Sequence, residues 1–437
     1  MAYPPNLPLP SNAADAPFEA GTYAKVTWRL MPLLFLCYVV SYLDRVNVGF
    51  AKLQMLNDLK LSETAYGLGA GIFFIGYFIF EVPSNMILHR VGARLWIARI
   101  MITWGVISGA MAFVSSAPMF YLMRFVLGAA EAGFFPGVIL YLTYWYPSHR
   151  RGRITALFMT GVPLSGVVGG PVSGWIMQNM PGVAGLAGWQ WLFVLEAVPS
   201  LLLGVVTIFY LQDRIVDAKW LREDQKQLLA AHVQREAGQK HDVPLRVMFA
   251  NPRVWLSALI YFSFVMGVYG VGFWLPTIIK ATGVSSTLEI GLLSTIPFAV
   301  SAVAMVLIGR SADRRRERRW HVAIPAWLGA VGLVLSTVYS HNTLLAMASL
   351  TLATIGIMAI LPLFWSLPTA FLAGSAAAAG IALINSLGNL AGFVSPYMVG
   401  WLKDLTQSTD SGMFVLAAWL LLGGLLTLTF PAKLVNT

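Results

Sequence analysis

The chain has 437 residues, of which 57% are hydrophobic and only 11% are charged, and its mean hydropathy is +0.71. Soluble domains carry about 25% charged residues, so the composition excludes a soluble globular protein and predicts an integral membrane protein. The formal net charge of +10 does not indicate a nucleic-acid-binding protein, because Lys and Arg cluster in short loops between apolar stretches, as membrane orientation requires.

Apolar stretches of about 20 residues recur along the chain, which predicts membrane-spanning α-helices rather than the shorter alternating strands of a barrel. Residues 1–24 are rich in Pro and Ala and lack the apolar core of a signal peptide, so we expect residues 1–27 to form a cytoplasmic tail. The predicted fold class is an all-α integral membrane protein with two six-helix bundles. We expect twelve spans, at 28–50, 66–88, 95–115, 119–143, 154–177, 190–211, 254–279, 289–309, 321–340, 343–365, 376–401 and 412–431.

The polar segment 212–253 divides these spans six and six. It predicts an N-terminal bundle over 28–211, a C-terminal bundle over 254–431 and a cytoplasmic tail at 432–437. Within the segment, 217–238 has helical spacing, and we interpret it as a surface helix that bridges the two bundles. Partner binding there is an alternative, although a plain linker is favoured. The apolar edge of this helix consists of Trp220, Leu221, Leu228 and Leu229.

Basic loops set the expected orientation. The loops HRVGAR (89–94), HRRGR (149–153) and RSADRRRERR (310–319) all lie on one side of the predicted spans. Because cytoplasmic loops carry an excess of Lys and Arg, this side is expected to be cytoplasmic. An even number of spans then places both termini in the cytoplasm.

Four charged residues interrupt otherwise apolar runs: Asp44 and Arg45 near the end of the first span, and Arg124 and Glu131 in the fourth. A charge at the centre of a bilayer costs at least roughly 2.5–3.5 kcal/mol. We therefore expect these side chains to face a wet cavity, which would be the path of an anionic substrate and a coupled proton.

A weak internal repeat relates the two halves at an offset of 224 residues. LSETAYGL (61–68) lies over SSTLEIGL (285–292), pairing Ser62 with Ser286 and Gly67 with Gly291, and the following basic loops also correspond. Two six-helix halves related by duplication are typical of transporters that work by alternating access, with the site near the midplane.

These features resemble the major facilitator superfamily, through the twelve spans and the Gly-x-x-x-Asp-Arg loop at 309–314. Three further stretches resemble its anion:cation symporter branch, which includes bacterial sugar-acid, tartrate and aromatic-acid permeases. They are Tyr42-x-Asp44-Arg45-Val-Asn, Glu81-Val-Pro-Ser-Asn and Arg124-Phe-x-x-Gly-x-x-Glu131-Ala-Gly-x-x-Pro136.

Arg124 and Glu131 are seven residues apart, so a helix places them on one face about 10 Å apart, with Gly128 between them leaving room beside the helix. A guanidinium suits anion recognition, and a carboxyl in apolar surroundings suits proton carriage. The alternative is a structural ion pair that joins helices.

Asp44 and Arg45 are adjacent and therefore about 100° apart on a helix. One arrangement directs Arg45 into the cavity and Asp44 towards a neighbouring helix; the alternative is an internal salt-bridged hinge. In the family that the chain resembles, the equivalents of Asp44 and Glu131 carry protons, and those of Arg45 and Arg124 hold the anion.

The predicted spans of the second half contain no Asp, Glu, Lys or Arg, so its site groups are expected to be neutral. The resemblance implies that Trp365 and Asn385 contact substrate there, and that Tyr42 and Tyr77 do so in the first half. The wider set of neutral candidates is Tyr261, Tyr269, Trp274, Ser386 and Asn389.

Gating roles are expected near the cytoplasmic loops. Glu81 precedes the first basic loop, and we interpret it as a gate or a latch to arginine side chains. By the resemblance, Arg90 in that loop and Asp313 and Arg314 in the corresponding loop also gate. Glu196, at the start of the sixth span, is expected to lie at the membrane interface.

We therefore expect a proton-coupled symporter of a small organic anion, such as a sugar acid, a tartrate-like acid or an aromatic carboxylate, in a bacterial inner membrane. Alternatives are an anion exchanger, a sodium-coupled transporter and a membrane receptor that binds an anion without moving it. No nucleophile–base set or metal-ligand spacing is present, so an enzyme, a metal site and a cofactor other than the transported proton are not expected. The expected partners are the substrate and the bilayer, with no nucleic acid, and the chain is expected to be a monomer.

Overall fold

The computed structural model describes residues 16–237, 250–372 and 374–436, and within these ranges the chain forms helices and no strands. The expected all-α fold is confirmed. Residues 1–15 of the expected tail, residues 238–249 of the linker and Thr437 lie outside the described residues.

The first half precedes the linker, and its helices are α1 (Ala16–Val46), α2 (Val48–Asp58), α3 (Glu63–Val91), α4 (Ala93–Ala110), α5 (Ala117–Glu131), α6 (Phe134–Thr143), α7 (Ser148–Met159), α8 (Gly161–Asn179) and α9 (Gly188–Tyr210). The linker contains α10 (Glu223–Ala237). The second half contains α12 (Pro252–Ala281), α13 (Thr287–Arg315), α14 (Arg319–Val338), α15 (Thr343–Phe364), α16 (Ser366–Thr369), α17 (Gly374–Asn389), α18 (Ala391–Thr406), α19 (Asp410–Thr427) and α20 (Ala432–Val435). Short 3₁₀ turns are η1 (Met111–Phe113), η2 (Val183–Gly185) and η3 (Ile215–Asp217).

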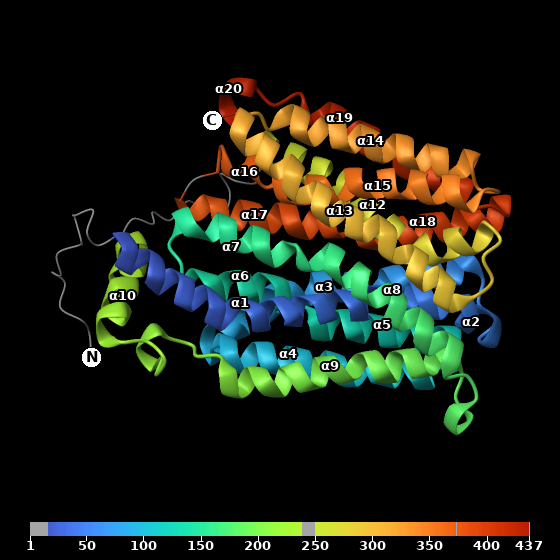
Figure 1. The fold of residues 1–437 in the computed structure, drawn as a ribbon, viewed down its shortest axis with the longest axis horizontal. Helices are drawn as coiled ribbons and strands as arrows, with labels where there is room; N and C mark the ends of the chain where they lie inside the picture. Colours follow the sequence, from blue (N-terminus) through green and yellow to red (C-terminus); the bar gives the residue numbers. More distant parts are fainter. Residues whose placement is uncertain (1–15, 238–249, 373, 437) are drawn as a thin grey trace.

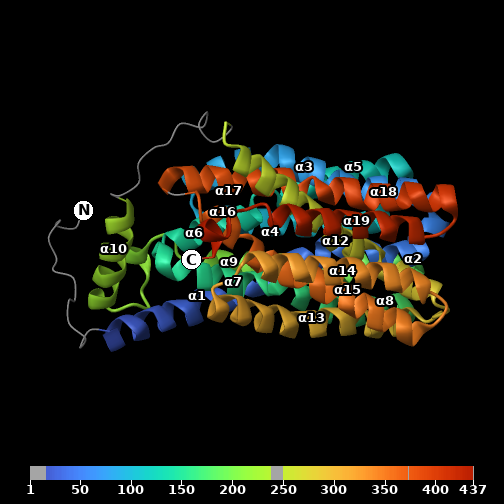
Figure 2. The same cartoon turned by 90° about the horizontal axis from the view of Figure 1, so that it is seen from above.

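The helices of both halves run along the long axis of the molecule and form two bundles that lie against each other (Figures 1 and 2). The start of α1, helix α10 and the short α20 lie towards one end (Figure 1). The basic segments 89–94, 149–153 and 310–319 also belong to this end; they were expected to be loops, but 149–153 lies within α7 and the other two are largely helical. We call this end the basic end, and the opposite end, marked by α2, the far end. Helix α12 is apolar around most of its circumference, and 78% of its most apolar 18-residue stretch is buried inside the protein. Such burial is typical of a central helix.

Among the described residues, eleven helical segments are long and apolar enough to cross a membrane. The remaining expected span, 376–401, is divided between α17 and α18 by a break at Leu390. Other spans are also interrupted where the sequence predicted continuous helices, at Asn47 between α1 and α2 and at Ala132 and Gly133 between α5 and α6. Broken helices at membrane depth are tolerated where they are buried in protein or line a cavity.

Helix α1 begins at Ala16, twelve residues before the expected start of the first span. The reason is packing: Tyr23 and Val26 in this extension are buried, and the linker helix α10 covers it. The Tyr23 hydroxyl lies 3.0 Å from Nδ1 of His232, and Lys25 donates to Gln225 at 3.4 Å. The expected surface helix therefore exists, but these contacts join α10 to the first half rather than bridging the two halves.

The internal repeat appears as matched helix starts and matched close contacts. Ser62 and Ser286 both act as N-caps, accepting from the Ala65 amide at 3.0 Å and from the Glu289 amide at 3.2 Å, which stabilises α3 and α13 in the same way.

Gly67 on α3 and Gly291 on α13 are also equivalent in the repeat. A Cβ at Gly67 would overlap the Pro396 carbonyl oxygen on α18, and one at Gly291 would overlap the Gly170 carbonyl oxygen on α8. Both glycines allow a helix of one half to approach the other half closely, as small residues do in membranes.

Candidate functional site

A buried ion pair lies at the centre of the molecule. Arg45, in the last turn of α1, is 8% exposed, and its Nη2 pairs with Oε1 of Glu131 at the end of α5. Its Nη1 donates to the Tyr269 hydroxyl on α12 at 3.0 Å, and the Ser41 hydroxyl donates to the same Glu131 oxygen at 2.8 Å. The Arg45 guanidinium therefore joins a carboxylate of the first half to a hydroxyl of the second.

Four aromatic rings surround this guanidinium. The Cζ atom of Arg45 lies 5.7 Å from the centroid of Tyr42, 5.4 Å from that of Phe73, 6.0 Å from that of Phe74 and 5.4 Å from that of Tyr77. Cation–π attraction is significant at these distances. The structure thus places the predicted substrate residues Tyr42 and Tyr77 beside Arg45, and the Tyr42 hydroxyl is buried with no hydrogen-bond partner among the described residues.

Arg124 lies next to this group but does not pair with Glu131. It is completely buried, and its guanidinium donates to the backbone oxygens of Gly69 at 3.3 Å, Ala70 at 3.2 Å and Arg45 at 3.4 Å. Its Nη1 has no hydrogen-bond partner in the described parts of the chain. Glu131 is instead paired with Arg45, so an Arg124–Glu131 ion pair is not formed, and Arg124 retains an unused donor.

Gly128 leaves room beside the helix, as expected, and the backbone of α3 occupies that room. A Cβ at this position would overlap the Phe73 carbonyl oxygen, so the backbone of α3 fills the space beside Gly128. The glycine serves close packing of α3 against α5. This packing brings the carbonyls of Gly69 and Ala70 within reach of Arg124.

Glu131 is the last residue of α5, because the fourth span breaks directly after it. Ala132 leaves helical geometry, and Gly133 has φ +87°, which L side chains rarely adopt. A helix C-terminus attracts a cation, which Arg45 supplies here. Discontinuous helices of this kind form the binding sites of many secondary transporters.

Asp44 points away from Arg45, as one of the two predicted arrangements required. Its carboxylate accepts from Trp104 Nε1 at 2.9 Å, from the Ser200 hydroxyl at 2.5 Å and from the Ser108 hydroxyl at 3.3 Å. These donors belong to α4 and α9, so Asp44 lies between helices of the first half. Asp44 and Arg45 do not pair with each other. The ion pair beside the break between α1 and α2 joins Arg45 to Glu131, so the alternative of an internal salt-bridged hinge stays open.

Glu196 was expected at the membrane interface, and this prediction was wrong. Helix α9 begins at Gly188, two helical turns earlier, so Glu196 lies within the helix and is only 3% exposed. Its Oε1 accepts from the Ser173 hydroxyl at 2.6 Å, and its Oε2 has no partner among the described residues. The expected start of the span, residue 190, was only two residues late, so the error was to treat Glu196 as belonging to that start although it lies six residues inside it.

In the second half, Asn385 and Ser386 on α17 both contact Glu81 of α3. Asn385 donates its amide to Oε1 at 3.3 Å, and Ser386 donates its hydroxyl to Oε2 at 2.9 Å. The expected latch from Glu81 to arginine side chains is therefore replaced by neutral donors of the other half. Trp365 is half-buried at the break between α15 and α16 and packs against Tyr261, with ring centroids 4.9 Å apart.

The other predicted gating residues lie at the basic end, away from the central site. Arg90 is exposed in the last turn of α3, and Arg314 is exposed near the end of α13. Asp313 pairs with Arg318 of the same loop at 2.6 Å. Their contacts are thus not with the central residues, and a gating role for them stays a prediction.

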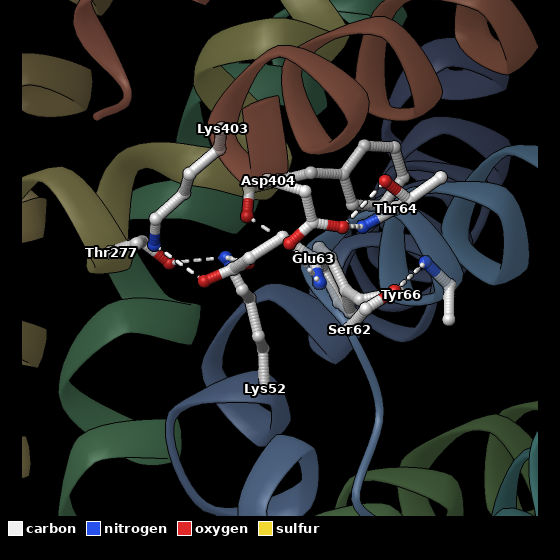
Figure 3. A network of polar contacts seen from close by, with 10 residues as sticks. Lys52, Ser62, Glu63, Thr64, Tyr66, Thr277, Lys403 and Asp404 are labelled. Carbon is white, nitrogen blue, oxygen red and sulfur yellow. Dashed lines mark hydrogen bonds and ion pairs between the residues drawn. The ribbon is translucent and has the colours of Figure 1, made fainter. Parts of the chain in front are cut away.

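A second charged cluster, which the sequence did not predict, bridges the halves at the far end (Figure 3). Glu63 pairs with Lys52 at 2.6 Å and with Lys403 of α18 at 2.5 Å. Asp404 accepts from the Thr64 amide at 2.7 Å, and Lys52 donates to Thr277 at 3.2 Å. We call Lys52, Glu63, Lys403 and Asp404 the far-end cluster; its two ammonium groups balance its two carboxylates.

The interface between the halves is therefore bridged by polar contacts on both sides of the Arg45–Glu131 pair. The far-end cluster lies on one side, and Glu81 with Asn385 and Ser386 lies on the other. A cavity of about 30 Å³ lies between the halves, lined in part by Tyr42, Asn47 and Ser165. Such a volume holds roughly one or two waters. The four buried charges were expected to face a wet cavity, but none of them lines this one.

Comparison with known proteins assigns the fold to a family. The sequence pattern described as Major Facilitator Superfamily matches residues 34–396. A Pseudomonas putida protein named as a candidate metabolite transport protein, NicT, is 53% identical over 416 residues, which cover 95% of each chain. An Agrobacterium vitis protein named as a candidate tartrate transporter is 50% identical over 412 residues, which cover 94% of this chain and 91% of that protein.

A solved structure supports the same fold. The crystal structure of a D-xylose–proton symporter has a TM-score of 0.73 and 19% sequence identity, over 93% of this chain and 98% of that one. At this identity the likeness concerns the fold alone. Together with the family match over most of the sequence, it completes the assignment: the chain is a multi-pass membrane protein of the major facilitator superfamily, a secondary transporter and not an enzyme.

Proposed function

We propose that this protein is a proton-coupled symporter of a small organic anion with a carboxylate group. It works by alternating access in a bacterial inner membrane with both termini in the cytoplasm. The observation that carries the proposal is the buried ion pair between the Glu131 carboxylate and the Arg45 guanidinium.

A substrate carboxylate and the Glu131 carboxylate would compete for the same cation. Two carboxylates facing one guanidinium in a buried site repel each other, and like charges at short range disfavour joint ionisation. A proton on Glu131 removes this repulsion and releases Arg45 for the substrate. Anion binding and proton binding therefore favour each other at this site, which is the thermodynamic requirement for symport.

Arg124 supports the same role. Its charge is desolvated, and its Nη1 is an unused donor close to Arg45. An anion that bridges Arg45 and Arg124 would satisfy this donor and neutralise a buried positive charge, and guanidinium groups recognise carboxylates through paired hydrogen bonds.

Asp44 is a second candidate proton carrier because it is buried among neutral donors and is adjacent in sequence to Arg45. Protonating Asp44 would weaken the network that orients the end of α1, which carries Arg45. The proposed role of Asp44 is thus indirect, through the position of Arg45.

The neutral groups of the second half would select the anion. The Tyr269 hydroxyl and the Asn385 amide suit hydroxyl-bearing acids, as does the Tyr42 hydroxyl on the facing first half. The name of the Agrobacterium vitis relative points to tartrate-like acids. Sugar acids and aromatic carboxylates present the same carboxylate and belong in the same test.

In alternating access, the contacts of the far-end cluster and the contacts of Glu81 with Asn385 and Ser386 would break in turn, each opening one end of the protein. Opening the far end requires breaking the Glu63–Lys403 pair, and opening the basic end requires that Asn385 and Ser386 leave Glu81. The Arg45–Tyr269 hydrogen bond lies between these two gates, where a bound anion would replace the tyrosine hydroxyl.

The test is transport by the purified protein in proteoliposomes. Candidate organic acids are first screened by thermal stabilisation of the protein, and radiolabelled uptake of the best ligand is then measured under an imposed pH gradient, a sodium gradient or neither. We expect accumulation that needs the pH gradient and is accompanied by proton uptake. Accumulation driven by sodium, or exchange alone without net proton movement, would overturn the proposal in favour of the rival modes.

A further inference from the structure

A large pocket lies at the basic end, away from the central ion pair. Its volume is about 620 Å³, and it is formed where α1, the start of α4, the end of α9 and the beginning of the linker meet. The side chains that matter here are Arg29, Arg94, Asp213, Lys219 and Phe209. None of them takes part in the proposed transport mechanism.

The basic side chains of this pocket exceed what its acids can neutralise. Asp213 caps the start of α4 by accepting from the Arg94 amide at 2.8 Å, and it also lies 3.8 Å from Arg94 Nε. The other acid, Asp217, pairs with Arg214 at 3.0 Å. Both carboxylates are thus engaged by groups other than Arg29 and Lys219.

Arg29 is held in position but has no carboxylate partner among the described residues. Its guanidinium stacks on the Tyr210 ring with Cζ 3.7 Å from the centroid, and its Nε is buried with no hydrogen-bond acceptor in the same described ranges. Lys219 is exposed on the linker and lines the same pocket. A guanidinium held by stacking and an exposed ammonium that line the same pocket are suited to bind a phosphate.

An apolar stripe leads directly into this pocket. Leu202 is 61% exposed, Val206 43% and Phe209 80%, and the spacing of these residues places them on one face of α9. Phe209 itself lines the pocket. On α1, Trp28 is 79% exposed next to Arg29, and aromatic side chains at such positions are typical of the membrane–water boundary.

We propose that this pocket binds the headgroup of an anionic phospholipid, with the phosphate between Arg29 and Lys219 and an acyl chain along the outer face of α9. The apolar stripe favours a lipid over a soluble phosphate, since a soluble ion would gain nothing from Leu202, Val206 and Phe209. Basic pockets at the end of membrane helices recognise anionic headgroups through the same charges. The site would join the first half to the start of the linker through a lipid.

The experiment uses the full chain, purified in a non-ionic detergent. Bound lipid is counted by native mass spectrometry, and the thermal unfolding midpoint is measured while phosphatidylglycerol is added. Phosphatidylcholine with the same acyl chains tests the need for negative charge, and glycerol phosphate tests the need for acyl chains. We expect phosphatidylglycerol to bind and to raise the midpoint, and the two comparison compounds to have little effect.

Two substitutions locate the site. Arg29→Gln and Lys219→Gln should each weaken phosphatidylglycerol binding about fivefold, since a basic side chain near a membrane surface contributes on the order of 1 kcal/mol. Arg253→Gln is the control, because Arg253 is also exposed at the start of α12 but lies outside the pocket. Lys219→Gln removes an exposed charge, so it tests the site even if the loss of stacking on Tyr210 unfolds Arg29→Gln.

The proposal is overturned if the Lys219→Gln and Arg253→Gln variants bind phosphatidylglycerol alike. It is also overturned if glycerol phosphate stabilises the protein as strongly as the lipid, which would indicate a soluble anion site. An unfolding midpoint that rises equally with phosphatidylglycerol and phosphatidylcholine would show that the pocket does not select an anionic headgroup, which also overturns the proposal. None of these outcomes depends on which anion the protein transports.

Discussion

Arg45 donates a hydrogen bond to the hydroxyl of Tyr269 at 3.0 Å, and the two residues are 224 positions apart. This is also the offset that relates Ser62 to Ser286 and Gly67 to Gly291 in the internal repeat. Two positions related by a twofold axis can touch only if both lie close to that axis. The pseudo-twofold axis therefore passes near this hydrogen bond, and the Arg45–Glu131 pair lies close to the axis about which the proposed alternating access would move the two halves.

The first prediction separates coupling from binding. Glu131→Gln mimics the protonated carboxyl and frees Arg45, so anion binding should survive and should depend less on pH. Accumulation driven by a proton gradient should be lost, while counterflow of labelled for unlabelled anion persists. Asp44→Asn is the comparison, with a similar or weaker effect, because its carboxylate contacts neutral donors only. Accumulation by Glu131→Gln at the rate of the parent protein would remove Glu131 from the proton path.

The second prediction concerns Arg124. Arg124→Ala should weaken anion binding about 10- to 100-fold, as expected for hydrogen bonds to a charged group. Arg124→Lys should restore only part of it, because an ammonium lacks the paired geometry of a guanidinium. Arg124 also satisfies the carbonyls of Gly69 and Ala70, so the unfolding midpoint is measured beside binding. Parent-like binding by either variant would contradict a substrate role.

The positions of the spans and the four buried charges were predictable, because hydropathy and charge are local properties of the sequence. The sequence did not predict that Glu131 pairs with Arg45 and not with Arg124, because this choice depends on how α1, α3 and α5 cross. The seven-residue spacing correctly predicted that one helix, α5, carries both Arg124 and Glu131, but spacing alone does not show which partner each side chain takes. The break directly after Glu131 was not predicted. Gly133 was the available signal for this break, and averaging hydropathy over a window concealed it.

The far-end cluster was missed for a related reason. The expected spans end at residues 50 and 401, which leaves Lys52 and Lys403 outside them, whereas the helices continue to Asp58 and Thr406. Polar residues near the end of a span do not end a helix when they find partners across an interface. Those partners come from the other half of the chain, which no local pattern reveals.

The third prediction distinguishes a substrate contact from a gate at Asn385. Asn385 and Ser386 both donate to Glu81, so a purely gating role predicts that Asn385→Ala and Ser386→Ala have the same effect on transport. If Asn385 also contacts the anion, Asn385→Ala alone should change which acids compete, with proton dependence retained in both variants. The measurement is inhibition of uptake by a panel of organic acids at two pH values. A loss of pH dependence with the same ranking of acids would contradict the substrate role.

The fourth prediction tests the far-end cluster as a gate. Lys403→Gln leaves two carboxylates facing one ammonium, so the far end should open more often. Because the Lys403–Glu63 pair is partly exposed, we expect a shift of about tenfold in the open-to-closed ratio, between the values for surface and buried pairs. Spin labels at Asn57 and Thr406, with Cys37→Ser as background, would report the distance across this end. Lys60→Gln removes an exposed charge at the same end and should leave the distance distribution unchanged.

The last prediction concerns the close contact between the halves at Gly67. A Cβ there would overlap the Pro396 carbonyl oxygen, which is backbone and cannot rotate away, so α3 and α18 must separate. Gly67→Ala should therefore cost about 1–3 kcal/mol of packing in the closed far end and should open that end, in the same direction as Lys403→Gln. Gly309→Ala is the matched control, because it also lies within a helix but a Cβ there meets nothing within 4 Å. The control should be neutral or stabilising by up to about 1 kcal/mol, since alanine favours helix over glycine. Thermal unfolding and the Asn57–Thr406 label distance measure both effects, and a Gly67→Ala variant that matches Gly309→Ala in both would show that the halves do not depend on this contact for closure.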